Sequence, residues 1–523
     1  MLKKTRRLYG VISTGLNYGT IAFMLFFSQT SMAYDENFYW YAEFGEGDFR
    51  YPTPIEPCQD YMRAIAIDAN FVSMLYYGIS KSLREGSPHI TWAAHNEYYC
   101  GGTLDASDGT SQTIDDWGWV ALHGQCPSPQ RLDEESATCK ALNLSPGQKG
   151  FASNPTCSKP SSLTGDPIDF VTGNNLQEEI DYAGKSLSFS RFYNSADGLW
   201  RSNYSAHLRI SPYQITLVMA NGEEKIFNRN GQALVQASGN YGLLQAADTR
   251  WVYSDGDVGN YTFDEGGRLV EVDPMGGVKI NLAYEDSKVV VTSDTGLSLS
   301  FSQDNFHQPQ SLSISGLNVS YTYSSGVLAR KTIVKDGVEQ ITNYLHEDAR
   351  DASLLTGIVD GDGVKRAAWK YDDAGRAISS ELAGAIGKVG VYYAPNGDPS
   401  VTNELGKVTS YHILNINNSK LISSVNGVPS ANCSASNSSY TYNDLGQVLT
   451  KTDANGLVTT YSYNDRGLEV SRVEASGTPL ARTTTTEWDP SRFLKTKVVE
   501  PTRTTLYTYD AQGRPLSQQT TSN

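Results

Sequence analysis

The feature that most constrains this chain is a short phrase that recurs in it: two aromatic residues flanking one other residue, then Asp or Asn, then Gly. One full unit runs from Tyr440-Thr-Tyr442-Asn-Asp-Leu-Gly446 through Asp453-Ala-Asn-Gly456 to Tyr461-Ser-Tyr463-Asn-Asp-Arg-Gly467, a step of 21 residues. Further copies are Tyr261–Gly267, Trp369–Gly375 and Tyr507–Gly513, with weaker ones at Tyr321–Gly326 and Glu487–Asp489. A fixed period of this length is typical of proteins that stack one supersecondary unit.

Each part of the phrase has a local physical reason. Residues i and i+2 lie on one face of a strand, so the two aromatics can pack together. Asp or Asn opens a turn by bonding its own backbone, and Gly accepts the positive φ of a bulged hairpin loop. The candidate turn residues are Gly267, Gly375, Gly446, Gly467 and Gly513. The candidate packed aromatics are Tyr261, Tyr371, Tyr440, Tyr442, Tyr461, Tyr463, Tyr507 and Tyr509. Sugar stacking on exposed tyrosines is the alternative, and the regular period favours a core role.

The same reasoning predicts a mostly β fold. Runs such as Lys185–Tyr193, Lys288–Thr292 and Leu297–Phe301 alternate polar and apolar residues, which predicts antiparallel strands with one buried and one solvated face. A lone hairpin is marginal in water, and large twisted sheets curl, so we expect the hairpin repeats to form a curved, spiralling sheet. The content of 32 Tyr against 16 Phe suits such strands.

The first 33 residues have the pattern of a secretory signal. A basic start at Lys3–Arg7 precedes a short apolar run at Ile21–Phe27, and Ser31-Met-Ala33 offers a cleavage site that would leave Tyr34 first. An uncleaved membrane anchor is the alternative. A membrane span requires about 20 apolar residues, however, and this stretch is interrupted by Ser13, Thr14, Asn17 and Gly19. No later segment is apolar enough to cross a membrane. We therefore expect an exported protein that is periplasmic, at the cell surface or secreted.

Residues 34–160 form a cysteine-containing region that ends in a linker rich in Ser, Pro, Gly and Thr at 145–164. Export permits disulfides, and five of the six cysteines lie in this region without the paired spacing of a zinc site. Sequence does not fix their connectivity. The favoured pairs are Cys126–Cys139, across a Pro-containing turn, and Cys58–Cys100.

Composition and motifs exclude several function classes. A net charge of −15, with no stripe of Lys and Arg, argues against a nucleic-acid partner. Motifs of hydrolases, zinc proteases, P-loops and dinucleotide binding do not occur, so we expect no enzyme and no cofactor. The runs His346–Asp348, Asp360–Gly363 and Asp255–Asp257 could suggest metal ligands, and solvated loops and turns explain them better.

The repeats resemble those of the Rhs/YD-repeat family. A second segment agrees, because Gly165–Asn175 followed by Ser188–Ser195 resembles the opening domain of Rhs proteins. The domains are therefore predicted as signal peptide 1–33, cysteine-containing region 34–160, Rhs-type opening domain 165–240 and YD repeats 241–523. The resemblance implies a hollow β shell, which in family members often encloses a C-terminal toxin. Asp273-Pro-Met-Gly276 matches a family core phrase but occupies a turn position, so we expect neither the core motif nor a toxin within these residues.

The leading hypothesis is an exported scaffold, or part of a toxin-encapsulating shell, acting in bacterial competition or surface interaction. Its partners would be proteins: a second copy, a downstream toxin or a complementary repeat chain that pairs with the last strand, Arg514 to about Gln519. The alternative is a carbohydrate-binding adhesion module that binds a cell-surface glycan through residues 34–160.

Overall fold

The computed structural model describes the backbone of four strands between Phe38 and Gly124, then Cys126 and the two ranges 130–150 and 160–523. Gaps within these two ranges are 134, 137, 143, 212, 231–232, 237–241, 256–258, 286–287, 418, 428–436 and 512. The expected signal segment, residues 1–33, and Cys58 lie outside the described residues.

The described chain is built from strands, as the alternating sequence predicts. It contains no α-helix and two short 3-10 turns, η2 (Pro146–Gln148) and η3 (Ala383–Ala385). None of its helices is long and apolar enough to span a bilayer. The N-terminal strands form one sheet in the order β1-β4-β3-β2, with bounds Phe38–Ala42 (β1), Leu83–Ala94 (β2), Glu97–Ala106 (β3) and Ser111–Gly124 (β4).

Three small sheets follow, which together we call the cap (residues 130–236). They have the orders β5-β6, β11-β10-β9-β8-β7 and β12-β13-β14-β15. Their bounds are Arg131–Asp133 (β5), Thr138–Lys140 (β6), Leu163–Thr164 (β7), Ile168–Asp169 (β8), Asn174–Ala183 (β9), Ser188–Asn194 (β10), Leu199–Ser202 (β11), His207–Ile210 (β12), Gln214–Val218 (β13), Glu224–Asn230 (β14) and Ala233–Gln236 (β15).

The rest of the chain forms one 26-stranded sheet, which we call the wall, and each strand pairs antiparallel with its sequence neighbours. Its first half comprises Leu243–Ala247 (β16), Arg250–Asp255 (β17), Gly259–Phe263 (β18), Leu269–Asp273 (β19), Ile280–Glu285 (β20), Lys288–Ser293 (β21), Ser298–Gln303 (β22), Pro309–Ile314 (β23), Leu317–Ser324 (β24), Val327–Lys335 (β25), Val338–Leu345 (β26), Gly357–Asp360 (β27) and Lys365–Tyr371 (β28). Its second half comprises Ala377–Leu382 (β29), Ile386–Tyr393 (β30), Pro399–Thr402 (β31), Val408–Ile416 (β32), Ser419–Gly427 (β33), Ser438–Tyr442 (β34), Val448–Thr452 (β35), Val458–Tyr463 (β36), Glu469–Glu474 (β37), Arg482–Trp488 (β38), Lys495–Val499 (β39), Arg503–Tyr509 (β40) and Pro515–Ser522 (β41).

Because neighbouring strands alternate in direction, the turns of the wall form two rows. Rim A holds the turns after even-numbered strands, among them 264–268, 304–308, 346–356, 372–376, 443–447 and 510–514. Rim B holds the turns after odd-numbered strands, among them 274–277, 294–297, 336–337, 361–364, 403–407 and 453–457. The Asp273-Pro-Met-Gly276 phrase is indeed a turn, on rim B between β19 and β20, with Gly276 at φ 72°.

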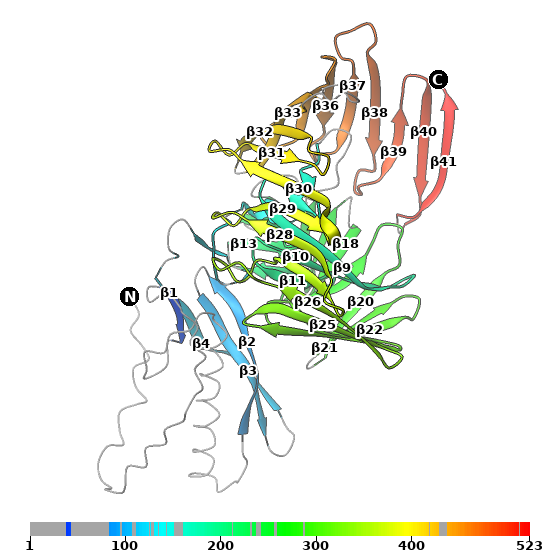
Figure 1. Cartoon of the computed structure of the whole chain (residues 1–523). Coiled ribbons are helices and arrows are strands. Elements are labelled where there is room, and N and C mark those ends of the chain that lie inside the picture. Colours follow the sequence, from blue (N-terminus) through cyan, green and yellow to red (C-terminus); the bar gives the residue numbers. More distant parts are fainter. Residues whose placement is uncertain are drawn as a thin grey trace, which may run out of the picture.

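The wall is strongly curved, as expected for so many twisted strands (Figure 1). Its last hairpin returns to its beginning: a methyl group on Gly513, in the β40–β41 turn, would lie 3.6 Å from Met275 Cγ in the β19–β20 turn. The sheet thus winds round until a late rim A turn meets an early rim B turn.

One apolar core joins the cap to the concave face of the wall, from Ile168 in the cap to Ile422 in β33. Beyond β33 the described wall has a separate small cluster, Tyr440, Val448 and Tyr461, which belongs to the repeats alone. The fold therefore has two layers where the cap fills the curve and a single layer toward the C-terminus.

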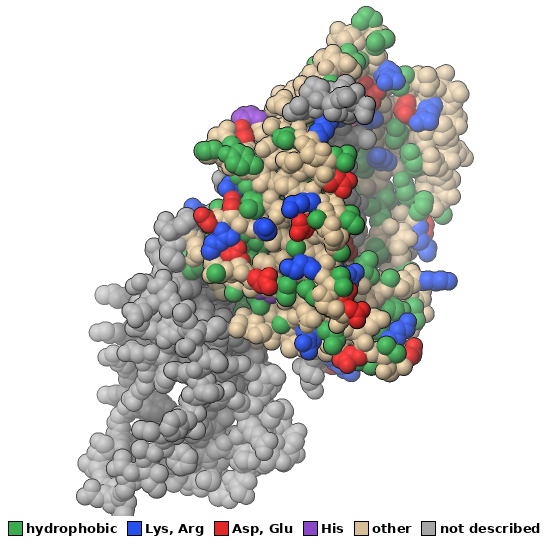
Figure 2. Space-filling view, in the orientation of Figure 1, with side chains coloured by type: hydrophobic (Ala, Val, Ile, Leu, Met, Phe, Trp, Pro, Cys, Tyr) green, Lys and Arg blue, Asp and Glu red, His purple; other side chains and the backbone are tan. Residues whose placement is uncertain are grey.

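Alternation has the predicted effect in β21 and β22, where Val289, Val291, Leu299 and Phe301 are buried on one face. It fails in Lys185–Tyr193. Strand β10 lies inside the curve with both faces covered, so Ser190 and Arg191 are buried together with Phe189. On the surface seen in Figure 2, acidic and basic side chains are mixed over the wall.

Candidate functional site at the capped rim

The repeat turns share one geometry, built by the first residue of each turn. In the full unit, Asn443 Oδ1 accepts the backbone N–H groups of Leu445 and Gln447 at 3.0 and 2.9 Å. Asp453 and Asn464 repeat this arrangement in the next two turns. The backbone φ angles are 90° at Gly267, 71° at Gly375, 74° at Gly446, 73° at Gly467 and 79° at Gly513. Only glycine adopts these values without strain.

The repeat aromatics differ in how deeply they are buried. The first aromatic is buried in the full unit, at Tyr440 and Tyr461, and Tyr371 is buried against the cap. The remaining aromatics Tyr261, Tyr442, Tyr463, Tyr507 and Tyr509 are half-buried.

The second aromatic of the phrase has a polar role as well. The hydroxyl of Tyr463 donates to the carbonyl of Val448 at 2.8 Å, and that of Tyr442 donates to the carbonyl of Ile422 at 2.5 Å. Similar bonds to the preceding odd-numbered strand are made by Tyr284, Tyr323, Tyr393, Trp488 and Tyr509. Val448 pairs with β34 but lies outside the β35–β36 ladder, so the phenol satisfies a carbonyl that the next strand leaves free.

The cap covers rim A through backbone as well as side-chain contacts. Leu208 N–H donates to the Gly267 carbonyl at 2.8 Å, and Ala377 N–H donates to the Gly173 carbonyl at 2.7 Å. A side chain at Gly267 would meet the Leu208 carbonyl at 2.4 Å, so this glycine is required both by the turn and by the cap. The contacts extend along rim A to Lys420, whose backbone bonds both amide atoms of Gln148.

Longer side chains fix the cap above the loop between β26 and β27. The Tyr193 hydroxyl donates to the Ser353 carbonyl and accepts from Leu355 N–H, both at 2.9 Å. The Tyr371 hydroxyl accepts from Asn175 Nδ2 at 2.7 Å and donates to the Leu355 carbonyl at 2.7 Å. A repeat aromatic of the wall is therefore also a contact of the cap.

A buried charge network lies at the centre of the cap–wall junction. Arg191 in β10 has no solvent exposure and forms a bidentate pair with Asp181 of β9, with a further contact to Glu179 at 3.0 Å. Lys331 of β25 reaches Asp181 at 2.9 Å and Glu179 at 2.8 Å. Two cations thus balance two carboxylates, one cation from the cap and one from the wall.

Aromatic residues surround this network. The Arg191 guanidinium lies 4.8 Å from the Trp200 ring centroid and 4.6 Å from that of Tyr321. Tyr321 donates to Asp181 at 2.7 Å, and Tyr344 donates to Glu179 at 2.6 Å. Burial alone would raise the pKa of the Asp181 carboxyl, but Arg191 and Lys331 lower this pKa to about 2. The carboxylate is thus held ionised beside two cations, one from the cap and one from the wall.

A second buried cluster ties the disulfide-bearing segment to β12–β14. Glu135 accepts from Arg209 at 2.7 Å, and its pKa is held well below the usual range because Arg209 and His207 outweigh the effect of burial. Lys149 pairs with Asp133 at 2.5 Å and with Glu224 at 2.7 Å. The predicted Cys126–Cys139 disulfide is confirmed, with a Cα–Cα distance of 5.5 Å, and it closes the start of this segment. Cys100 lies in β3, and its proposed partner Cys58 lies outside the described residues.

Of the remaining sequence candidates for a metal or acid–base site, Asp257 lies outside the residues that the structure describes, and the others bond as loop and turn residues do. His346 Nε2 bonds the Leu328 carbonyl at 3.1 Å, and Asp348 pairs with Arg350. Asp360 accepts the backbone of Asp362 and Val364 as a turn residue does. Within the described residues, no group of three or more His, Cys, Asp or Glu side chains is placed to hold a metal ion.

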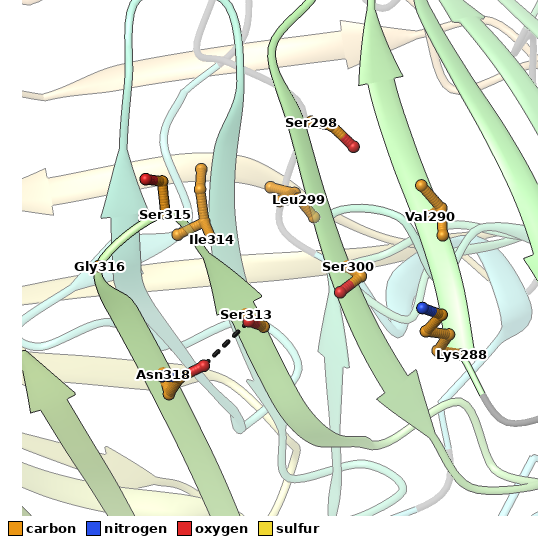
Figure 3. A pocket seen from close by; sticks show the side chains of 10 residues that line it. All are labelled: Lys288, Val290, Ser298, Leu299, Ser300, Ser313, Ile314, Ser315, Gly316 and Asn318. Atoms are coloured by element: carbon orange, nitrogen blue, oxygen red, sulfur yellow. Dashed lines mark hydrogen bonds between the residues drawn. The ribbon is translucent and has the colours of Figure 1, made fainter.

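A shallow groove of about 390 Å³ lies on the convex face of β21–β24 (Figure 3). Its walls carry Ser298, Ser300, Ser313 and Ser315, and Ser313 Oγ donates to Asn318 Oδ1 at 2.9 Å. The groove faces away from the cap, because these serines alternate with the buried Leu299 and Leu312.

Sequence reasoning missed the charged residues of the junction. Arg191 occupies an apolar-face position in an alternating run, between Phe189 and Tyr193. A charge at such a position predicts a buried partner, and the acidic stretch around Glu179 and Asp181 is ten residues away on the paired strand. Lys331, on the wall, carries no comparable sequence signal.

Two family models match the chain. One, described as RHS Repeat, matches residues 442–479, and the other, described as a domain of unknown function (DUF6531), matches residues 165–227. The chain therefore contains an RHS repeat and this second domain. The two matched ranges coincide with the full repeat unit of the wall and with most of the cap. A search of curated proteins found no match.

Solved structures with low similarity include the TcdB2-TccC3 proteins. The form without the hypervariable C-terminal region is 11% identical with a TM-score of 0.35, and the match covers 84% of this chain and 26% of that one. TcdB2-TccC3 itself is 12% identical with a TM-score of 0.29, covering 83% and 25%. A TcdB2-TccC3-Cdc42 structure is 12% identical with a TM-score of 0.28, and the match covers 65% of this chain and 20% of that one. This RHS-repeat chain therefore spans at most about a quarter of the length of those chains.

Proposed function

We propose that this RHS-repeat protein is a structural scaffold: a curved wall, closed along one rim by its own cap, that forms part of a container for a protein partner. The observation that supports this proposal is that buried ion pairs and hydrogen bonds hold the cap against the wall. A buried, charge-balanced network and backbone bonds along rim A fix the cap inside the curve, while the concave face of β34–β41 lies beyond it. A toxin, a second copy or a complementary repeat chain is the class of partner that such a wall would enclose or join.

The role is structural rather than catalytic on this proposal. The buried ionisable groups of the junction are paired with one another: Arg191 pairs with Glu179 on the neighbouring cap strand, Lys331 joins the wall to the cap, and Arg209 joins one cap sheet to another. Paired, charge-balanced groups of this kind specify one docked arrangement. The place of action would be outside the cytoplasm, in competition between bacteria or in surface contact, after cleavage at Ala33. N-terminal sequencing of exported protein that begins at Met1 would contradict this cleavage.

Labelling of paired cysteine variants tests the container role. Thr484 lies on the concave face, in the row of Tyr461 and Arg472, and its neighbour Thr485 lies on the convex face. We expect Thr484→Cys and Thr485→Cys to react equally with a small maleimide in the full chain. A bulky polymer-linked maleimide should react at least about tenfold more slowly at Thr484→Cys, because access to the concave face is restricted. Equal rates with the bulky reagent would show an open surface and contradict the proposal.

The groove of Figure 3 supports a second candidate function, binding of a cell-surface glycan. Serine hydroxyls and the amide of Asn318 can exchange hydrogen bonds with sugar hydroxyls, and the groove lies on the convex face, where a polymer can reach it. Retention of the full chain on a polysaccharide column, lost in a Ser300→Val, Ser313→Val variant, would favour this function. Passage of the unmodified chain through columns of neutral and acidic polysaccharides would remove it.

A further inference from the structure

The two rims of the wall differ in what covers them. Between β18 and β33 several turns of rim A contact the cap, as at Gly267, His307 and Ser353. In the described residues the last of these contacts along the wall is at Lys420. Rim A is therefore uncovered by the cap at the turns that follow β34, β36 and β38.

Rim B carries a row of exposed apolar side chains. They recur at or beside one turn after another: Met275, Leu297, Val338, Val364, Ile386, Leu405, Leu457 and Leu480. The most exposed are Leu405 at 86%, Leu480 at 70% and Ile386 at 67%. Single exposed apolar residues need no explanation, but a row at equivalent positions along one rim indicates a contact surface.

At one point of rim B, a turn of the same chain packs against such an apolar side chain. The rim A turn at 510–514 lies against Met275, with the position of a Gly513 methyl 3.6 Å from Met275 Cγ. From the other side, a methyl on Gly276 would lie 3.9 Å from Pro515 Cδ. Figure 1 shows the β40–β41 turn and the start of β41 beside the early strands of the wall. A glycine-containing turn of rim A is thus complementary to an apolar turn of rim B.

Each chain also carries exposed rim A turns and exposed apolar rim B side chains that do not take part in the contact between the 510–514 turn and Met275. Rim B is exposed from Leu297 to Leu480, and the uncapped part of rim A carries turns of the same kind, with Leu445 52% exposed. We propose that rim B binds the uncapped rim A turns that follow β34, β36 and β38 of a second copy of this chain. Two chains then stack coil on coil through their turns, a contact distinct from pairing along the free edge of β41.

This pairing does not require that the wall encloses a cargo, so it can fail separately from the proposed function. The test is sedimentation velocity of the full chain over a wide range of concentration. We expect reversible association that weakens at least about tenfold in the Leu405→Asp, Ile386→Asp variant, since the buried apolar contacts would then hold unpaired carboxylates. Leu445→Asp, on the opposite rim, should weaken it similarly. Because all three residues are exposed, the variants should keep the far-UV circular dichroism and melting temperature of the parent.

The matched control is Tyr213→Asp, which places the same charge at an exposed aromatic of the cap, 83% accessible and part of neither rim. This variant should associate as the parent does. A parent chain that remains monomeric at every concentration would overturn the proposal, and so would rim variants that associate as tightly as the parent. If Thr521→Lys on the free edge abolishes association and the rim variants do not, the contact runs through β41 and the proposal is wrong.

Discussion

The buried network at the cap–wall junction gives the sharpest test of how this fold is held. In Arg191→Met the side-chain volume is nearly kept, but Asp181 and Glu179 would share the single cation Lys331. Removing one partner of a buried ion pair costs about 3–5 kcal/mol, because the remaining charge is buried without compensation. We therefore expect the cap to open far more readily, with the wall strands beyond β33 unaffected.

Native-state hydrogen exchange with mass spectrometry measures this opening directly. Since about 1.4 kcal/mol is a factor of ten, amides of β9 and β10 should lose roughly two to three and a half orders of magnitude of protection. Peptides from β36–β39 report on the single-layer part of the wall and should keep their exchange rates. The matched control is Arg330→Met, at the neighbouring position on the convex face, where the exposed guanidinium bonds Asn343 at 3.1 Å. Its effect should stay within about 0.5 kcal/mol.

A double variant separates the charge argument from simple loss of packing. In Arg191→Met, Asp181→Leu one carboxylate and one cation remain, Glu179 and Lys331, 2.8 Å apart. The double variant should therefore be less destabilised than Arg191→Met alone, by about 2 kcal/mol. If the two changes simply add, or if Arg191→Met leaves the exchange of β9 and β10 unchanged, the network does not hold the cap.

Four further outcomes follow from the same structure. The pKa of Asp181, lowered to about 2, lies below its ordinary value of 3.8, so its stabilising effect is present above about pH 4 and is lost as the pH falls toward 2; the exchange difference between the parent and Asp181→Asn should shrink over that window. Tyr463→Phe removes the hydroxyl that donates to the Val448 carbonyl. It should lower the free energy of local opening in β35–β36 by about 1 kcal/mol, measured by hydrogen exchange. Gly446→Val should lower the melting temperature because its φ of 74° is strained for any branched residue, whereas Thr483→Val, exposed in β38, should be neutral; equal melting temperatures would argue against the turn geometry. Cys139→Ser should cost up to about 3 kcal/mol in the segment around η2, and limited proteolysis that cuts the parent and this variant there at the same rate would contradict it.

The sequence by itself determined the wall. Aromatic pairs at i and i+2, Asp or Asn at the start of the turn and Gly at its positive-φ position are local requirements, satisfied within one hairpin. For that reason the antiparallel repeats, the turn glycines, the Cys126–Cys139 pair and the turn at Asp273–Gly276 could be predicted from residues close together in the chain. The same locality explains why the RHS repeat is recognisable in a single unit.

Only the tertiary structure decided how the wall is closed. Asp181 and Lys331 meet although 150 residues separate them, and Arg191 is buried because β10 lies inside the curve rather than at a surface. The return of Gly513 to Met275 depends on curvature summed over many strands, to which each hairpin adds a small twist. Period-two alternation cannot distinguish a strand with one face covered from a strand covered on both faces. The physical reason is that alternation records the two faces of one strand, whereas their burial depends on what the curved sheet brings against each of them.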